Sequence, residues 1–333
     1  MKHVISLFDF NAGELRKLFE LASELKARLL NGERPALLPG RVLTQVFEKP
    51  SLRTRVSFEA AIIHLGGTSI FLSGKDAGLH GRESLPDVAR VLTDYSDAVV
   101  LRTFSHELIQ EFSEYSSCPV INGLSDRNHP CQALTDIFTI QEVFGADHSR
   151  KIVFVGDGNN VANSLAVAAA LLKIPFTLAA PEEYQLPDEF LAQLELFVPG
   201  AEIEQTADPH KAVRDAGVIY TDVWASMGQE SEREERKKVF APYQVNAKLF
   251  QAAPGDCRFM HCLPAHRGEE VTDDIIDGPQ SLVFPQAENR MHLAKGLLVW
   301  LLGEVQGPGS RVQGQKSQQS RDKSQVPEED RDV

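Results

Sequence analysis

The chain has 333 residues, of which 42% are hydrophobic and 24% are charged, proportions typical of a globular protein. Its formal net charge of −13, from 34 Lys and Arg against 47 Asp and Glu, argues against a protein that coats nucleic acid. The length predicts about two domains whose cores need no disulfide framework. The 4 cysteines form no C-x-x-C pair, which argues against zinc ribbons and thioredoxin-type motifs, and we expect reduced thiols in the cytoplasm.

Neither a membrane segment nor a secretory leader is expected. Acidic residues occur too early in the chain for a leader, and no small-residue cleavage site follows an apolar core. The longest apolar stretch, residues 165–172, is too short to cross a bilayer.

Apolar runs typical of strands alternate with helical patterns along the first half of the chain. An amphipathic helix is predicted over residues 12–30. Strands are predicted over residues 42–47, 68–72, 98–102 and 119–122, with helices over 56–65, 85–95, 107–115 and 130–144. This alternation is typical of a parallel α/β sheet.

The alternation starts again after a polar segment, residues 145–151. Strands are predicted over residues 151–155, 176–179, 201–204, 218–222 and 258–261, and a final helix over about 288–305 that packs back toward the first half. We expect an α/β fold with two similar-sized domains, 1–146 and 147–305, each a parallel sheet flanked by helices, and an active site in the cleft between them. Residues 306–333, rich in Gln, Ser and charge, are expected to form a disordered tail.

The first motif, residues 47–55, lies between a predicted strand and a predicted helix. Ser51 is a natural N-cap, and the free N–H groups of a first helical turn bind anions. Together with Arg53 and Thr54, this turn suits a phosphate group. A capped surface helix with solvated arginines is the alternative.

His129-Pro130-x-Gln132 opens the predicted helix 130–144, where proline suits the first turn. His129 and Gln132 are three positions apart and can reach the same side. By itself this pattern fits a capping histidine as well as a catalytic one.

Gly156-Asp157-Gly158 follows an apolar strand and resembles the start of a dinucleotide-binding fingerprint. The third glycine is absent, since Val161 and Ala162 follow. A tight turn that needs glycine conformations is the alternative.

Two further motifs follow predicted strands: residues 222–228, which begin at Asp222, and His261-Cys262-Leu263-Pro264. Cys262 fits either a polar ligand group or a buried structural cysteine. Because His261, Cys262 and His266 lack the spacing of a structural zinc site, no metal is expected.

Jointly and in this order, the motifs resemble those of the aspartate/ornithine carbamoyltransferase family, over about residues 1–305. Ser51-x-Arg53-Thr54-Arg55 and His129-Pro130-x-Gln132 are similar to the family's carbamoyl-phosphate motifs. Asp222-x-x-x-Ser226-Met227-Gly228 and His261-Cys262-Leu263-Pro264 are similar to motifs that separate its ornithine enzymes from its aspartate enzymes. The resemblance implies a homotrimer that converts carbamoyl phosphate and L-ornithine to L-citrulline and phosphate, in arginine metabolism, without cofactor or metal.

The resemblance also implies a set of site residues. Arg102, His129, Asp222 and Cys262 are expected to be catalytic. Carbamoyl phosphate is expected to be bound by Ser51, Leu52, Arg53, Thr54, Arg102, His129, Gln132, Cys262, Leu263 and Arg290. Ornithine is expected to be bound by Asn160, Asp222, Ser226 and Met227.

Two positions depart from the family pattern. Leu52 stands where ornithine enzymes more often have threonine, which keeps an N-acylornithine enzyme open as a second interpretation. Gly78 falls where many relatives have a glutamine that reaches a neighbouring subunit, and His80 or Arg82 could substitute for it. Three further functions stay open: carbamoyl transfer to aspartate or putrescine, NAD-dependent oxidoreduction, and a non-catalytic regulatory role.

Overall fold

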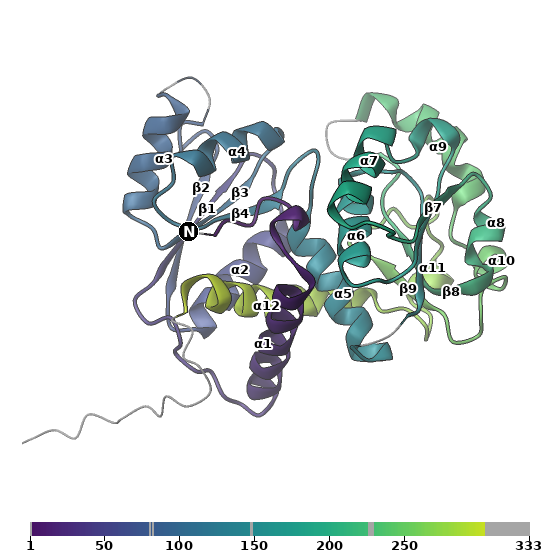
Figure 1. The fold of residues 1–333 in the computed structure, drawn as a ribbon, viewed down its shortest axis with the longest axis horizontal. Coiled ribbons are helices and arrows are strands. Elements are labelled where there is room, and N and C mark those ends of the chain that lie inside the picture. The colour runs from purple at the N-terminus through teal and green to yellow at the C-terminus, as the bar shows by residue number, and fades with distance from the viewer. Residues whose placement is uncertain (1, 80, 82, 147–148, 226–229, 304–333) are drawn as a thin grey trace, which may run out of the picture. The chain divides into compact units, whose positions relative to one another are not determined.

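Two parallel sheets organise the chain in the computed structural model, which describes residues 2–79, 81, 83–146, 149–225 and 230–303 (Figure 1). The first sheet has the order β2-β1-β3-β4 and consists of β1 (Val42–Phe47), β2 (Thr68–Ser73), β3 (Ala98–Arg102) and β4 (Val120–Leu124). The second has the order β7-β6-β5-β8-β9 and consists of β5 (Lys151–Val155), β6 (Phe176–Ala179), β7 (Ile203–Thr206), β8 (Ala216–Thr221) and β9 (Arg258–His261). Every strand pair is parallel, which confirms the predicted fold class.

The strand order reverses once in each sheet. In the first sheet the chain moves outward from β1 to β2 and returns to the other side of β1 with β3. In the second it moves outward from β5 to β7 and returns beside β5 with β8. Ligands of open parallel sheets bind beyond the carboxyl ends of the strands at such a reversal.

Helices connect the strands. They are α1 (Ala12–Leu30), α2 (Leu52–His64), α3 (Leu85–Asp94), α4 (His106–Glu114), α5 (Pro130–Phe144), α6 (Asn160–Leu171), α7 (Asp188–Phe197), α8 (Pro209–Ala212), α9 (Arg233–Phe240), α10 (Ala247–Phe250), α11 (Asp273–Ile276) and α12 (Val283–Leu302). The helix predicted to start at residue 56 begins at Leu52, because the Ser51 hydroxyl caps it by accepting from the Thr54 amide at 3.2 Å. None of the helices that the structure describes is both long and apolar enough to cross a bilayer.

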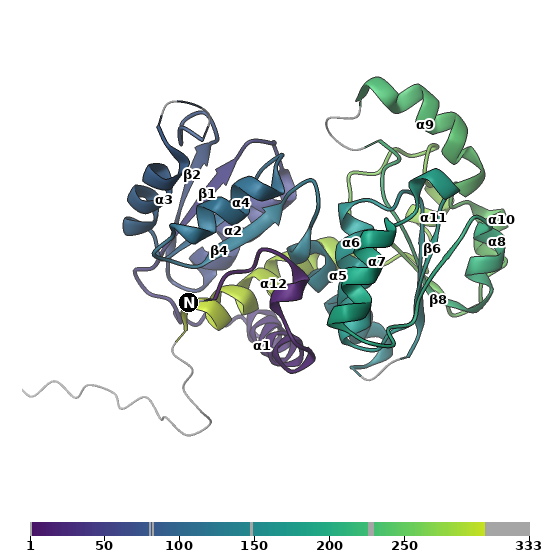
Figure 2. The same ribbon diagram turned by 45° about the horizontal axis from the view of Figure 1, so that its top comes forward.

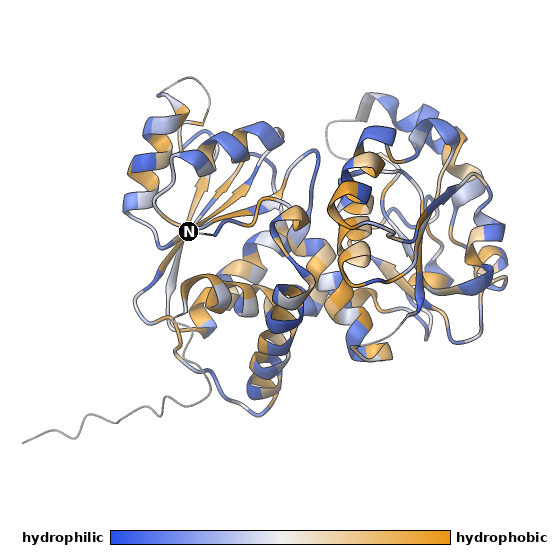
Figure 3. Cartoon of the chain, in the orientation of Figure 1, coloured by the Kyte–Doolittle hydropathy of each residue, from blue (hydrophilic) through white to orange (hydrophobic). Residues whose placement is uncertain are grey.

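The last helix, α12, packs against three helices of the first half, α1, α2 and α5 (Figures 1 and 2). Gly296 permits this contact with α1, since a Cβ at this position would lie 3.0–3.1 Å from Ala22. Leu293, Leu297 and Leu298 of α12 belong to the same hydrophobic core as Leu18 of α1. Many strands and helices such as α6 are coloured as hydrophobic, whereas β7 is largely hydrophilic (Figure 3).

Candidate active site

A cavity of about 1060 Å³ is lined by residues that follow strands of both sheets, at the points where the strand order reverses. The first half contributes the turn after β1, the end of β3 and the start of α5. The second half contributes the turns after β5, β8 and β9, and α12 adds Arg290. Predicted site residues that line it are Ser51, Leu52, Arg53, Thr54, Arg102, His129, Gln132, Asn160, Asp222, Cys262, Leu263 and Arg290. The predicted residues Ser226 and Met227 lie outside the described residues.

The N-terminus of α2 opens into this cavity. Its first turn presents backbone N–H groups at Leu52 and Arg53 beside the Ser51 hydroxyl. The Leu52 side chain is 75% exposed, so its contribution to the cavity rim is chiefly that of its backbone. This geometry is a ready-made binding site for an anion.

Three of the guanidinium groups that line the cavity repel one another: Arg53, Arg102 and Arg290. Burial, together with repulsion from Arg290 and Arg53, lowers the pKa of Arg102 to about 9. Burial also lowers the pKa values of Arg53 and Arg290. The Nε atoms of Arg102 and Arg290 are buried with no hydrogen-bond partner among the described residues. An anion bound here would satisfy these donors and relieve their mutual repulsion.

His129 is a neutral imidazole. Burial is the main cause of a pKa far below the ordinary histidine value, and the charges of Arg290, Arg102 and Arg53 add to it. Its backbone N–H donates to the Ser164 hydroxyl at 2.8 Å, which holds the start of α5 against α6. The ring atom Nδ1 has no partner among the described residues. A neutral ring can offer one N–H to a carbonyl oxygen in the cavity.

Gln132, Thr54 and Arg290 form a buried hydrogen-bonded group. The Arg290 guanidinium donates to Oε1 of Gln132 and, at 2.9 Å, to Oγ1 of Thr54. The structure thus joins α2, α5 and α12 through residues that are far apart in the sequence.

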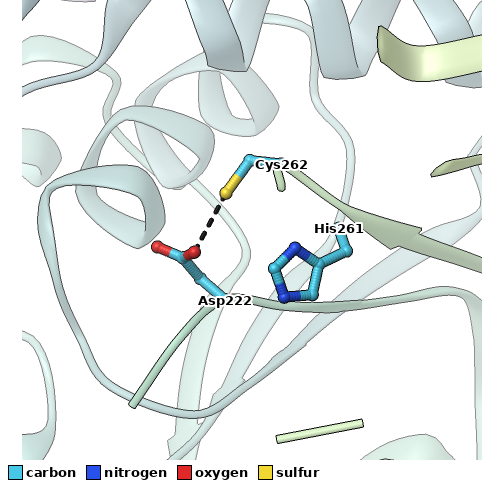
Figure 4. Close-up of side chains that lie close together, drawn as sticks. All are labelled: Asp222, His261 and Cys262. Atoms are coloured by element: carbon cyan, nitrogen blue, oxygen red, sulfur yellow. Dashed lines mark hydrogen bonds between the residues drawn. The ribbon is translucent and has the colours of Figure 1, made fainter. Parts of the chain in front are cut away.

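Asp222 and Cys262, each directly after a strand, meet at the opposite wall of the cavity (Figure 4). The Cys262 thiol donates to Oδ1 of Asp222 at 3.0 Å, and the Asn159 amide donates to Oδ2 at 3.0 Å. Burial, with the Asp222 charge as the next cause, raises the pKa of Cys262 well above its ordinary value. Cys262 is therefore a neutral thiol that donates a hydrogen bond to Asp222, and carboxylate oxygens can also accept from cationic groups.

Potential metal ligands meet here, because Asp222, His261 and Cys262 bring ligand atoms within 4.8 Å of one another (Figure 4). Both ring nitrogens of His261 are already engaged: Nδ1 accepts from the Leu263 amide at 2.9 Å, and Nε2 lies 3.1 Å from Glu270. Because the backbone N–H requires the lone pair of Nδ1, the proton is on Nε2 and no lone pair is left for a metal.

Asn160 and Leu263 also lie at the cavity. The Asn160 amide donates to the Ser125 carbonyl at 2.6 Å, so it bridges α6 and the loop before α5. Leu263 has a positive φ of 56° and precedes a cis peptide bond to Pro264.

Asp157 and Arg236, which were not predicted as site residues, form an ion pair in the cavity wall. The Arg236 guanidinium donates to Asp157 at 2.9 Å and to the Trp224 carbonyl at 3.1 Å, and its side chain is buried. Arg236 stands in the charged run 232–238, which is typical of a solvated helix, so local sequence carries no signal for its burial.

The glycines around Asp157 have structural reasons of their own. Gly156 has a φ of +142°, and a Cβ on Gly158 would lie 2.8 Å from the Tyr184 carbonyl oxygen. These constraints account for the Gly-x-Gly pattern as a tight turn that approaches a neighbouring loop.

Comparison with known proteins places the chain in a family. Residues 2–142 match the aspartate/ornithine carbamoyltransferase carbamoyl-P binding domain, and residues 148–301 match the Asp/Orn binding domain of the same enzymes. The chain therefore belongs to the aspartate/ornithine carbamoyltransferase family, which confirms the resemblance of its motifs.

Similar relatives within this family are named ornithine carbamoyltransferase. The protein of Anoxybacillus flavithermus is 49% identical over 303 residues, which cover 90% of this chain and 96% of that protein. The anabolic enzyme of Pyrococcus furiosus is 48% identical over 307 residues, 91% of this chain and 97% of that protein. The solved structure of Pyrococcus furiosus ornithine carbamoyltransferase superposes with a TM-score of 0.86, covering 90% of this chain and 97% of that one at 48% identity. The anabolic enzyme of Campylobacter jejuni gives 0.84 at 40% identity, covering 90% and 99%.

Proposed function

We propose that this chain is an ornithine carbamoyltransferase that converts carbamoyl phosphate and L-ornithine to L-citrulline and phosphate. The observation that carries the proposal is one cavity with two unlike walls. One wall holds a helix N-terminus, the buried guanidinium groups of Arg102 and Arg290 and the half-buried Arg53, and the other holds the Asp222 carboxylate. A small acyl phosphate suits the first wall, and an amine suits the second.

The two halves divide the substrates in this proposal. Residues 1–146 hold carbamoyl phosphate, residues 147–305 hold ornithine, and residues 306–333 take no part. The phosphate lies against Ser51, the Leu52 amide, Arg53 and Thr54. The carbamoyl oxygen faces Thr54, Arg102 and His129. The carbamoyl NH2 faces the Gln132 side chain and the Leu263 carbonyl, with Cys262 and Arg290 beside them.

Ornithine occupies the opposite wall. Its δ-amine lies against Asp222 and Cys262, and its α-amino and carboxylate groups lie against Asn160, Ser226 and Met227. The Asn160 amide donates to the Ser125 carbonyl at 2.6 Å through one N–H, and its second N–H can donate to the ornithine carboxylate.

The reaction forms a C–N bond and breaks a C–O bond. The δ-amine, after it loses one proton, attacks the carbamoyl carbon, and the C–O bond to phosphate breaks with its electron pair leaving on phosphate. The attacking nitrogen then gives up a second proton, which the departing phosphate accepts. Asp222 attracts the δ-ammonium and orients it as its proton departs. Arg102, neutral His129 and Thr54 donate to the carbonyl oxygen as negative charge develops there, and Arg53 with the α2 N-terminus stabilises the leaving phosphate. The carbamoyl carbon already bears a good leaving group, so the proposed reaction uses no cofactor.

We assign the reaction to arginine biosynthesis, as in the anabolic relatives from Pyrococcus furiosus and Campylobacter jejuni. The four cysteines are all free, which fits a reducing compartment, and we propose the cytoplasm. A homotrimer is the proposed assembly. Exposed apolar side chains on α2 and on the edge strand β2 support an interface in the first half.

A product assay with a panel of amines tests the proposal. Carbamoyl phosphate is incubated with L-ornithine, N-acetyl-L-ornithine, putrescine or L-aspartate, and the ureido product is identified by mass. We expect citrulline from L-ornithine, with the remaining amines at least 100-fold slower. If N-acetylornithine or putrescine reacted faster, that amine and not ornithine would be the substrate. If none of the amines gave a ureido product, the protein would not be a carbamoyltransferase for these amines.

A further inference from the structure

Asp136 lies on α5 one turn after Gln132, and its carboxyl group is fully buried. Its Oδ1 accepts from Nε2 of Gln132 at 2.8 Å and from Nε2 of Gln286 at 2.6 Å. Only one end of a glutamine amide can donate a hydrogen bond. A single carboxylate oxygen therefore determines which way both amides point.

The consequence for Gln132 is a defined acceptor. Its Nε2 is committed to Asp136, so its Oε1 faces the cavity side, where the Arg290 guanidinium donates to it. The Arg290 guanidinium, which offers donors only, and the Asp136 oxygen, which accepts, therefore fix opposite ends of the same amide. The orientation that Asp136 enforces is the one that can accept a hydrogen bond from a bound NH2 group.

Gln286 extends the same network to the second sheet. Its Oε1 accepts from the His261 backbone amide at 3.0 Å, and its Nε2 also lies 3.2 Å from the Tyr220 hydroxyl. His261 directly precedes Cys262, so the position of the β9 end is tied through α12 to Asp136. One buried carboxyl group thus connects residues of both cavity walls.

The network holds in either protonation state of Asp136. Burial raises the pKa of Asp136 to about 7, against opposing hydrogen bonds from Gln132, Gln286 and Tyr220. A proton can reside on Oδ2, which has no partner among the described residues, and Oδ1 then still accepts from both amides. Hydrogen-bond acceptance at Oδ1, and not negative charge, is the property that the structure requires.

We propose that Asp136 is a positioning residue for the carbamoyl group: it locks Gln132 so that Oε1 accepts from the carbamoyl NH2. This rests on the proposed function, because carbamoyl phosphate is the ligand that brings that NH2 group. Asp136 itself does not touch the substrate.

Calorimetric binding of two anions tests this role without turnover. Phosphonoacetamide is an unreactive analogue that keeps the amide NH2, whereas inorganic phosphate lacks it. In Asp136→Ala we expect phosphonoacetamide to bind at least tenfold more weakly and phosphate to change by less than twofold, since one or two hydrogen bonds are lost on the amide side only. Asp136→Asn keeps an acceptor oxygen and should bind phosphonoacetamide within about threefold of wild type.

A double-mutant cycle separates positioning from general damage. On a Gln132→Ala background, Asp136→Ala should weaken phosphonoacetamide binding by less than a further twofold, because Asp136 acts through Gln132. Thr139→Val is the matched control: it removes a buried α5–α12 hydrogen bond, from Asn289 at 3.0 Å, and should leave both affinities unchanged. If Asp136→Ala does not fold, Asp136→Leu fills the same space without an acceptor.

Equal weakening of both anions, independent effects in the cycle, or no rescue by Asp136→Asn would overturn the proposal. The proposal would also be overturned if wild type bound phosphonoacetamide no better than phosphate, because Gln132 would then make no favourable contact with the NH2 group. Failure of the ornithine assignment looks different: wild type would bind phosphonoacetamide, respond to Asp136→Ala as expected, and yet make no citrulline.

Discussion

Two buried guanidinium groups, the half-buried Arg53 and a neutral histidine face one cavity, and each affects the ionisation of the others. Burial and the charges of Arg290 and Arg53 disfavour the charged form of Arg102. Burial, with the arginine charges as a further cause, keeps His129 neutral. The cost of holding them together is recovered only when an anion binds. The positive charge on this wall therefore favours binding of an anion. Single substitutions of these residues should affect binding and turnover more than folding.

Arg53→Ala should cripple the use of carbamoyl phosphate and leave the fold intact. The guanidinium stands at the N-terminus of α2, where its contacts strengthen as charge moves to the departing phosphate. Its loss should cost about 2–4 kcal/mol of transition-state stabilisation in kcat/KM. Arg55→Ala is the matched control, because Arg55 pairs with Glu59 and stacks on Phe71 and does not line the cavity. Near-normal kcat/KM for Arg53→Ala would refute the phosphate assignment.

Asp222→Asn should impair the reaction of ornithine while leaving the binding of carbamoyl phosphate nearly unchanged. The substitution keeps the shape and the acceptor toward the Cys262 thiol but removes the charge that attracts the δ-ammonium. We expect kcat to fall at least 100-fold, with phosphonoacetamide binding nearly unchanged. L-norvaline, which is ornithine without the δ-amine, should bind wild type and variant alike in the presence of phosphonoacetamide. Cys262→Ser, which keeps a donor to Asp222, should give a milder loss. Equal weakening of phosphonoacetamide and norvaline in Asp222→Asn would show that its role is structural.

Two helices, α5 and α12, connect the walls of the cavity. Each carries residues of the site on one side and core residues on the other: α5 places His129, Gln132 and Asp136, and α12 places Gln286 and Arg290. Since both helices are buried along most of their length, small shifts in their packing reach the substrate directly. The stability of α12 is therefore part of how the site is assembled.

His292 on α12 should make the protein less stable in mild acid. Burial, followed by the charge of Lys295, lowers the pKa of His292 from 6.5 to about 4. Between these values the unfolded chain binds a proton that the folded chain does not, so the free energy of unfolding falls as the pH drops from 6.5 toward 4. One such group contributes a slope of about 1.4 kcal/mol per pH unit.

The measurement is urea unfolding at pH 7 and pH 5 in buffers free of phosphate. Between pH 7 and pH 5, the free energy of unfolding of wild type should fall by about 2 kcal/mol more than that of His292→Gln, because glutamine stays neutral throughout. His210→Gln, at an exposed position on α8, is the control and should retain the wild-type pH dependence. If the free energy of unfolding fell as much in His292→Gln as in wild type, groups other than His292 would cause the loss of stability in acid.

Apolar side chains exposed on the first half predict a surface that is buried in an oligomer. Leu52, Val56 and Ile63 are 75%, 50% and 60% exposed along one face of α2, beside the edge strand β2. A face of this kind is typical of a surface that another subunit covers. The exposed apolar residues of the second half, such as Leu196 at 85%, do not form part of this face.

Light scattering should therefore give a mass near three times 36.8 kDa at micromolar concentration. The double variant Val56→Lys/Ile63→Lys should shift the mass toward one chain, because charge on this face opposes its burial. Leu196→Lys, which adds a charge on α7, should leave the mass unchanged. A fully active wild-type monomer would refute the trimer, and an unchanged mass in the double variant would place the interface elsewhere.

Local sequence was enough to predict where the strands lie and that Ser51 caps a helix, although the helix begins at Leu52 and not at residue 56. It also contains the motifs that identify the family. These features depend on hydrophobic period, capping and turn chemistry, which act over a few residues. For the same reason the helix 12–30 and the strands 42–47, 98–102 and 151–155 were predicted with the bounds that the structure has.

Only the tertiary structure decided which of these elements meet. The order β2-β1-β3-β4 depends on non-local pairing, and the bond from Arg290 to Thr54 joins residues 236 positions apart. Burial, which no local pattern reports, makes His129 neutral and keeps Cys262 a thiol. It also turns Arg236, in a charged run, into part of the cavity wall, and Asp136, in an apolar helix, into the acceptor that orients Gln132. The reason is physical: ionisation and hydrogen-bond choice depend on which groups surround a side chain, and only the folded chain brings those groups together.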